Sequence, residues 1–287
     1  MARLSPYLKR DFLREHLVQI GYISVGVVLF LVFLAASFPY AEILSNVLGP
    51  AGLEISSQGQ GVSFPFGVRM TGVSLSEISG RGQRPLIESP DVRVSPSLLS
   101  FLMLSPGVNV KASLYGGVLR VRMRRRGNLI ALDFDLENLH PGRYPALRAL
   151  GASLSGTLSA QGSLELSPED IAADHGTVTI SGSGIAVSAI RGMTPVRLGE
   201  IHAVAALEHG KLTLRNARTS GGDLMFSGRG VMMLSRVLAE SEMAIRFELR
   251  AAPAARARLA FLLGMLPHPP GPTPYLLGGT LAAPTLS

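Results

Sequence analysis

The chain has 287 residues, of which 47% are hydrophobic and 16% are charged; its net charge is +7 and its mean hydropathy is +0.32. It is thus more apolar than an ordinary soluble domain, and part of it is expected to lie in a membrane. The absence of cysteine excludes disulfides, thiolate metal sites and a cysteine nucleophile, and no basic helix or aromatic RNA-binding strand motif accompanies the charge to indicate nucleic-acid binding.

The first expected element is a transmembrane helix at residues 17–41. This segment contains no charged residue, and its apolar run from Val18 to Phe38 is about as long as a helix needs to cross the hydrocarbon of a bilayer. Basic residues outnumber acidic ones in residues 1–16, so the positive-inside rule places that segment in the cytoplasm and residues 42–287 in the periplasm of a bacterial inner membrane. The expected anchoring side chains are Val18, Ile20, Val25, Val27, Leu29, Phe30, Leu31, Phe33 and Leu34.

A cleaved signal peptide is the alternative interpretation of the same segment. Ala35-Ala36-Ser37 offers small residues to a signal peptidase. However, the apolar run is longer than the core of an ordinary signal peptide, and 16 residues precede it. An uncleaved anchor is therefore expected.

The exported part is expected to be mainly β. Short runs of alternating apolar and polar residues, separated by glycine-containing turns, favour an antiparallel sheet or open barrel over βαβ units. Glycines inside these runs let a sheet bend, so a strongly curved sheet is expected. The expected strands lie within residues 62–75, 86–94, 108–136, 152–166, 177–189, 196–207, 211–216, 223–233, 243–249 and 276–281. Hairpin turns are expected at His209-Gly210, which pairs Glu208 with Lys211, and at Gly221-Gly222.

The segment 108–136 allows a strand register to be predicted. Two turn signals, Gly116-Gly117 and Gly127-Asn128, divide it into three runs, and two-residue turns there place Leu114 opposite Leu119. The same register pairs Ala112 with Val121, Val110 with Met123, Met123 with Leu132, Val121 with Phe134 and Leu119 with Leu136. One face of the three strands is then apolar and is a candidate groove, formed by Val110, Ala112, Leu114, Leu119, Val121, Met123, Leu132, Phe134 and Leu136.

The other face of these strands is expected to carry charges, namely Lys111, Arg120, Arg122, Arg124, Asp133 and Asp135. Arg122 would lie opposite Asp133 and Arg120 opposite Asp135, and such cross-strand pairs contribute roughly 0.2 to 1 kcal/mol each. A solvated, partly paired outer face is the first interpretation. An anion-binding patch for lipid headgroups or a partner protein is the second. Because the aspartates already have arginine partners, no metal is expected there.

Three segments break the alternation, at residues 96–105, 141–150 and 253–266. Each begins with a proline, which suits the first turn of a helix, and the last places Leu259, Leu262, Leu263 and Leu266 on one side. Short packing helices are expected; plugging the end of the sheet or lying on a membrane is the alternative. Residues 267–275 are proline-rich and form a stiff linker to a last strand.

The sequence lacks the local motifs of common enzymes. Its six histidines are isolated without paired metal-ligand spacing, and no nucleophile elbow, Walker loop or strand-to-helix dinucleotide motif occurs. We therefore expect a protein that is not an enzyme, with no catalytic residue, no cofactor and no metal.

Two stretches resemble a known family. They are residues 135–147 (DLENLHPGRYPAL), which run into the glycine-rich residues 151–164 (GASLSGTLSAQGSL), and residues 279–284 (GTLAAP). With the single anchor, this layout resembles the type II secretion system protein N family in its longer form, over most of the chain. The resemblance implies an accessory subunit that binds other inner-membrane components of the machine that moves folded proteins from the periplasm across the outer membrane. It carries over no catalytic residue.

A second similarity concerns residues 211–230 (KLTLRNARTSGGDLMFSGRG). Their sequence pattern is similar to that of the repeats of AsmA-like envelope proteins. Those proteins are large curved sheets with an apolar groove linked to lipid movement. This similarity implies an alternative function, the binding or transfer of phospholipid or lipopolysaccharide through an apolar groove.

Overall fold

The computed structural model describes residues 53–63, 67–79, 82–97, 107–144, 153–167, 170–188, 195–235 and 240–287. The expected cytoplasmic segment, the expected transmembrane helix with its anchoring side chains, and residues 98–105 and 145–150 of two expected helices lie outside these ranges. Within the ranges, no helix is both long and apolar enough to cross a membrane.

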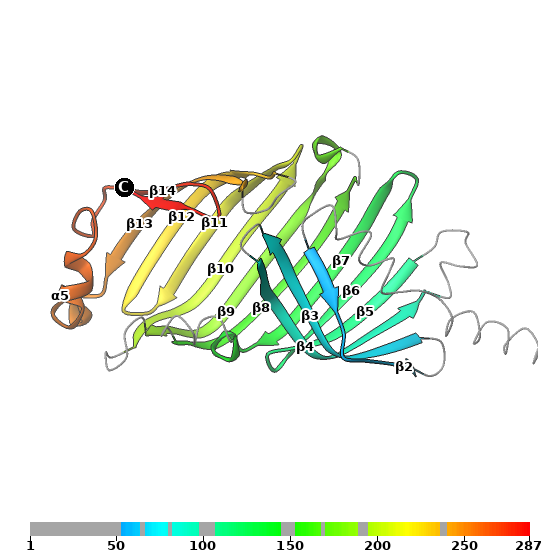
Figure 1. Ribbon diagram of the computed structural model, residues 1–287. Coiled ribbons are helices and arrows are strands. Elements are labelled where there is room, and N and C mark those ends of the chain that lie inside the picture. The colour runs from blue at the N-terminus through cyan, green and yellow to red at the C-terminus, as the bar shows by residue number, and fades with distance from the viewer. Residues whose placement is uncertain are drawn as a thin grey trace, which may run out of the picture.

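The described strands form one fifteen-stranded antiparallel sheet (Figure 1). Their path follows chain order from β1 to β15, except that β2 leaves the path and pairs with β3 beside β1. The strands are β1 (Leu53–Ser56), β2 (Gly59–Ser63), β3 (Gly67–Ser79), β4 (Gly82–Pro96), β5 (Gly107–Leu114), β6 (Gly117–Arg126), β7 (Leu129–Leu139), β8 (Ser153–Leu166), β9 (His175–Ser188), β10 (Val196–Glu208), β11 (Lys211–Gly221), β12 (Leu224–Met233), β13 (Glu242–Ala251), β14 (Tyr275–Gly279) and β15 (Pro284–Leu286). The expected mainly β architecture is confirmed.

The sheet is twisted and open. In Figure 1 the strands β5 to β13 run side by side with a common tilt, whereas β3 and β4 run in a different direction at the N-terminal end. Strands β1 and β15 lie at the two ends of the pairing path, so the ladder does not close on itself. Consecutive strands pair because most of them are joined by short connections, which favour antiparallel neighbours.

The second hairpin has the expected register. Strands β6 and β7 turn at Gly127-Asn128, and Met123 lies opposite Leu132, with Val121 opposite Phe134 and Leu119 opposite Leu136. The hairpin between β10 and β11 also turns as expected, at His209-Gly210, with Glu208 opposite Lys211. Local turn residues were therefore sufficient to specify these two hairpins.

The predicted register of the first hairpin was wrong by two residues. The turn is Tyr115-Gly116, both at positive φ, so Leu114 lies opposite Gly117 rather than Leu119. The same shift pairs Ala112 with Leu119, Val110 with Val121 and Val108 with Met123. A shift of two leaves every side chain on its expected face, because the side chains of a strand alternate with a period of two.

Gly117 lies in strand β6 rather than in the turn because it approaches strand β7 closely. A Cβ at this position would lie 2.3 Å from the Glu137 carbonyl oxygen, too close for any side chain. Tyr115 takes the turn position instead, with its hydroxyl accepting a hydrogen bond from the Glu88 backbone N–H at 3.0 Å and its ring packed edge-on against Tyr144.

Four other expected boundaries differ in the structure. The expected strand 62–75 is split between β2 and β3, and the expected last strand 276–281 is replaced by β14 and β15, which flank Leu281. Pro96 is the last residue of β4 and does not begin a helix. The turn expected at Gly221-Gly222 is formed by Gly222-Asp223, because β11 continues to Gly221, which pairs with Gly199 of β10.

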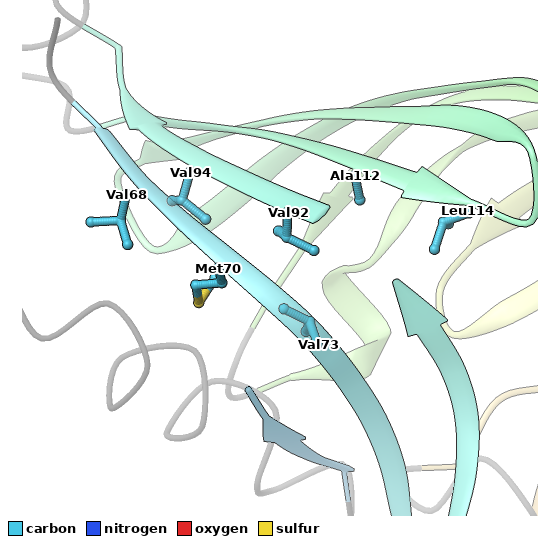
Figure 2. Close-up of a cluster of buried hydrophobic side chains, with 7 residues drawn as sticks. All are labelled: Val68, Met70, Val73, Val92, Val94, Ala112 and Leu114. Carbon is cyan, nitrogen blue, oxygen red and sulfur yellow. The ribbon is translucent and has the colours of Figure 1, made fainter. Parts of the chain in front are cut away.

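The buried core lies in two clusters at opposite ends of the sheet. The larger one joins side chains of β3, β4 and β5, as Figure 2 shows, and consists of Val68, Met70, Val73, Val92, Val94, Ala112 and Leu114. The smaller one packs Val196 of β10 against Ala255 and Leu259. Alternation accounts for most of the larger cluster, since Val68 and Met70, Val92 and Val94, and Ala112 and Leu114 are each two residues apart on their strand.

The expected C-terminal packing helix is confirmed. A 3₁₀ turn at Pro253–Ala255 leads into α5 (Arg256–Gly264), whose Leu259 is 2% exposed in the smaller cluster with Leu262 and Leu263 packed beside it. The helix lies at the C-terminal end of the sheet, next to β13 (Figure 1). At Pro141–Arg143 the described part of the second expected helix is a single 3₁₀ turn.

Candidate functional site

The most extensive surface feature is an apolar face that continues across the sheet. Residues that are register partners share a face, so the pairings define rows that run across the strands. One row crosses β5 to β14 and consists of Ala112, Leu119, Leu136, Ala160, Ile180, Ala203, Ala217, Gly228, Phe247 and Tyr275. No polar side chain interrupts it.

A neighbouring row on the same face is also free of polar side chains. It consists of Val110, Val121, Phe134, Gly162, Val178, Ala205, Leu214, Gly230, Ile245 and Leu277. We call the two rows together the apolar face. The three-strand apolar surface predicted from sequence is therefore one part of a face that spans the strands β5 to β14.

The apolar face is closed at its ends and partly exposed between them. Ala112 and Leu114 are each 6% exposed within the β3 to β5 cluster, and Tyr275 is fully buried against Phe247 and His268 at the other end. In the middle, Ile180 is 39% exposed.

The residues proposed for a groove therefore divide into two groups. Ala112 and Leu114 belong to the packed core, and Val110, Leu119 and Leu136 pack against it. The others are half-buried, namely Val121 and Phe134 of the apolar face and Met123 and Leu132 in the row next to it.

Glycines within the apolar face make room for aromatic neighbours. A Cβ at Gly162 would lie 2.5 Å from Cε1 of Phe134, its partner on β7, and a Cβ at Gly228 would lie 2.9 Å from the Cβ of Phe247. Aromatic rings that cover cross-strand glycines compensate for the packing that the glycine itself lacks. These glycines thus have a packing role beyond the bending that the sequence suggested.

The opposite face is hollowed over β4 to β7. A cavity of about 560 Å³ lies there, and its charged lining residues are Arg93, Lys111, Arg120, Arg122, Asp133 and Asp135. We call it the basic hollow. The register brings these residues together, because Lys111 lies opposite both Arg93 and Arg120, while Arg122 lies opposite Asp133.

The ion pairs in the basic hollow follow the predicted register only in part. Arg120 Nη1 lies 3.1 Å from Asp135 Oδ2, as expected, and 2.8 Å from Glu137 Oε1. The hydrogen bond from Arg120 lowers the pKa of the Glu137 carboxyl. Asp133, however, pairs with Arg124 at 2.9 Å rather than with Arg122, and it accepts a hydrogen bond from Ser163 at 2.8 Å.

Arg122 is consequently left without a carboxylate among the residues that the structure describes. Although Asp133 lies opposite it in the ladder, the long side chain of Arg124 reaches that carboxylate diagonally. The expected pairing is therefore correct as a register and wrong as a salt bridge. Within the described ranges, no three His, Asp or Glu residues lie close enough together to hold a metal ion.

The family-like stretches occupy two places in the sheet. Of the first stretch, residues 135–144 are described: they end β7 and form the 3₁₀ turn at Pro141–Arg143, and residues 279–284 join β14 to β15. The protein-family models, curated proteins and solved structures compared with this chain give no match. Residues 211–230, with their AsmA-like cadence, form most of the β11 to β12 hairpin.

Proposed function

We propose that this protein is a periplasmic accessory component of the type II secretion system, anchored in the bacterial inner membrane, and that it acts by binding other proteins of the machine. The family-like stretches and the apolar segment at residues 17–41 motivate the proposal. It is supported chiefly by the architecture, because a single open sheet offers unpaired edges and two broad faces for contacts with partners.

Strand β2 is the edge best suited to accept a strand from a partner. Within the described part of the chain it pairs with β3 alone, and its Val62 is 64% exposed. The opposite edge, β15, spans only Pro284–Leu286, and a short strand that contains proline is protected against further pairing.

The test is crosslinking of the full chain in intact membranes, followed by purification and identification of the captured proteins. We expect inner-membrane components of the secretion system, and we expect Val62→Lys to reduce their capture because an edge lysine opposes strand addition. Leu286→Lys at the other edge is the matched control. If no secretion component is captured, and deletion of the gene leaves exoprotein release unchanged, the proposal is wrong.

The apolar face favours a second candidate function, the binding of lipid acyl chains in the manner of AsmA-like proteins. Its rows cross β5 to β14 without a polar side chain, and half-buried residues at its middle offer apolar surface to a ligand. A photo-crosslinking residue placed at Ile180 in the full chain should capture phospholipid or lipopolysaccharide. The same residue at Ser181, on the other face of β9, should not. Equal labelling at both sites, or lipid at neither, would contradict this function.

A further inference from the structure

A row of like charges runs through the basic hollow and extends beyond it to Arg69, and the fold alone does not explain this row. Arg69, Arg93, Lys111 and Arg120 are direct register partners on β3, β4, β5 and β6. Like charges directly opposite one another in a sheet are destabilising. Such a row needs negative charge beside it, either from carboxylates of the protein or from a bound anion.

Three of the four cations already have carboxylate partners. Asp91 accepts from Arg69 Nε at 2.5 Å and lies 3.4 Å from Arg93 Nε, and the Arg69 hydrogen bond is the main cause of the lowered pKa of its carboxyl. Arg120 is paired with Asp135 and Glu137. Lys111 stands between Arg93 and Arg120 and has no carboxylate partner among the described residues.

Lys111 and Arg122 are therefore the two unpaired cations of the hollow. They lie on the neighbouring strands β5 and β6. Lys111 lies directly opposite Arg120, and Arg122 follows two residues after Arg120 on the same face, so Lys111 and Arg122 are diagonal neighbours across the two strands. Asn109 and Ser95 also line the cavity and add an amide and a hydroxyl. The two carboxylates of the lining, Asp133 and Asp135, are each held by an arginine.

We propose that the basic hollow binds a phosphate monoester group, with Lys111 and Arg122 contacting its oxygens. Two unpaired cations match the charge of such a group, which is about −1.5 to −2 at neutral pH. The guanidinium plane can donate to two phosphate oxygens at once, while the lysine acts as a point charge. Of the cations that the sequence placed on this face, Arg120 and Arg124 pair with carboxylates, which leaves Lys111 and Arg122 for the phosphate.

This site goes beyond the proposed function, because Lys111 and Arg122 lie on the face opposite the apolar rows and on the inner strands β5 and β6 rather than on an edge strand. The phosphate could belong to a lipid headgroup or to a soluble compound. Soluble short-chain phosphatidic acid and inorganic phosphate distinguish the two sources.

The test uses the full chain in phosphatidylcholine nanodiscs, with binding measured by calorimetry for each probe. The variant Lys111→Gln with Arg122→Gln should bind at least about tenfold more weakly, because both contacts are charge-assisted. The control variant Arg125→Gln with Arg126→Gln also removes two positive charges, but from residues of β6 that do not line the hollow. It should retain binding. Binding of phosphatidic acid alone identifies a headgroup site, and binding of both probes identifies a general phosphate site.

A stability measurement separates ligand binding from a structural role. Without ligand, Lys111→Gln should unfold at a higher temperature than the unmodified chain, because it relieves repulsion from Arg93 and Arg120. A lower unfolding temperature would show that Lys111 supports the fold. That result, binding of neither probe, or equal loss of binding in the control variant would overturn the proposal.

Discussion

Asp223 and Arg258 join the C-terminal helix to the sheet, with Arg258 Nη2 lying 2.5 Å from Asp223 Oδ2. Asp223 precedes β12 and its side chain is only 6% exposed, while Arg258 lies on α5. Arg197 of β10 binds the same carboxylate through its backbone N–H at 3.0 Å and its Nη2 at 3.2 Å. One buried carboxylate thus connects a strand, a turn and a helix that are far apart in the sequence.

Replacing Asp223 with asparagine should destabilise the C-terminal end of the sheet. The change leaves Arg197 and Arg258 without a charged acceptor, and hydrogen bonds to charged groups are worth about 1.5 to 3 kcal/mol. We expect a loss of about 2 kcal/mol in the free energy of unfolding, measured by denaturant titration. Glu248→Gln removes the exposed Arg250 pair and should cost less than about 1 kcal/mol. Equal losses in the two variants would contradict the anchoring role of Asp223.

The same carboxylate should make stability depend on acidic pH. The Arg197 hydrogen bond is the main cause of the lowered pKa of Asp223. A carboxyl with a lowered folded-state pKa stabilises the protein fully above its unfolded-state pKa of about 3.9, and this contribution is lost as the pH falls through the folded-state value. Thermal unfolding between about pH 6 and pH 3 should therefore show a smaller acid-induced decrease in Asp223→Asn than in the unmodified chain. Parallel curves would count against this role.

Gly230 should not tolerate even a methyl group. A Cβ there would lie 2.5 Å from the Ala244 carbonyl oxygen and 2.5 Å from the Ile245 Cα, both backbone atoms of β13. Gly230→Ala should lower the free energy of unfolding by about 1 to 3 kcal/mol, as overpacking does. Gly61→Ala is the matched strand control, because nothing lies within 4 Å of the added Cβ. Equal stability of the two variants would show that β12 and β13 are not packed this closely.

The register of the first hairpin can be tested by crosslinking, because the chain contains no cysteine. Lys111→Cys with Arg120→Cys should form a disulfide readily on mild oxidation, since direct cross-strand partners have Cα atoms about 4.5 to 5.5 Å apart. Lys111→Cys with Arg122→Cys, the pair that a Gly116-Gly117 turn would bring together, should react more slowly. Counting free thiols over time measures both rates. Faster reaction of the second pair would support the register expected from sequence.

The error in this hairpin shows where local signals become insufficient. The sequence Tyr115-Gly116-Gly117 allows two different two-residue turns, and both leave the same side chains on each face. The choice depends on Gly117 meeting the Glu137 backbone of β7, which is separated from it in the chain by the whole β6 to β7 hairpin. No window around the turn contains that contact.

The charged face leads to the same conclusion. The sequence placed Arg122 opposite Asp133 correctly, because register follows from the Gly127-Asn128 turn. It could not show that Arg124 would take the Asp133 carboxylate, or that Arg93 of β4 would stand opposite Lys111. Long side chains can reach partners on more than one strand. Which two cations lack a carboxylate partner is therefore visible only in the assembled sheet.

By itself, the sequence determined that the described part of the chain is an antiparallel β meander with one apolar and one charged face, because alternation with a period of two and short turns are local properties of the chain. The tertiary structure alone decided the register at Tyr115-Gly116, the continuity of the apolar face from β5 to β14 and the charge balance of the basic hollow. These depend on close backbone approach, strand irregularities and side-chain reach between distant residues, which no local pattern encodes.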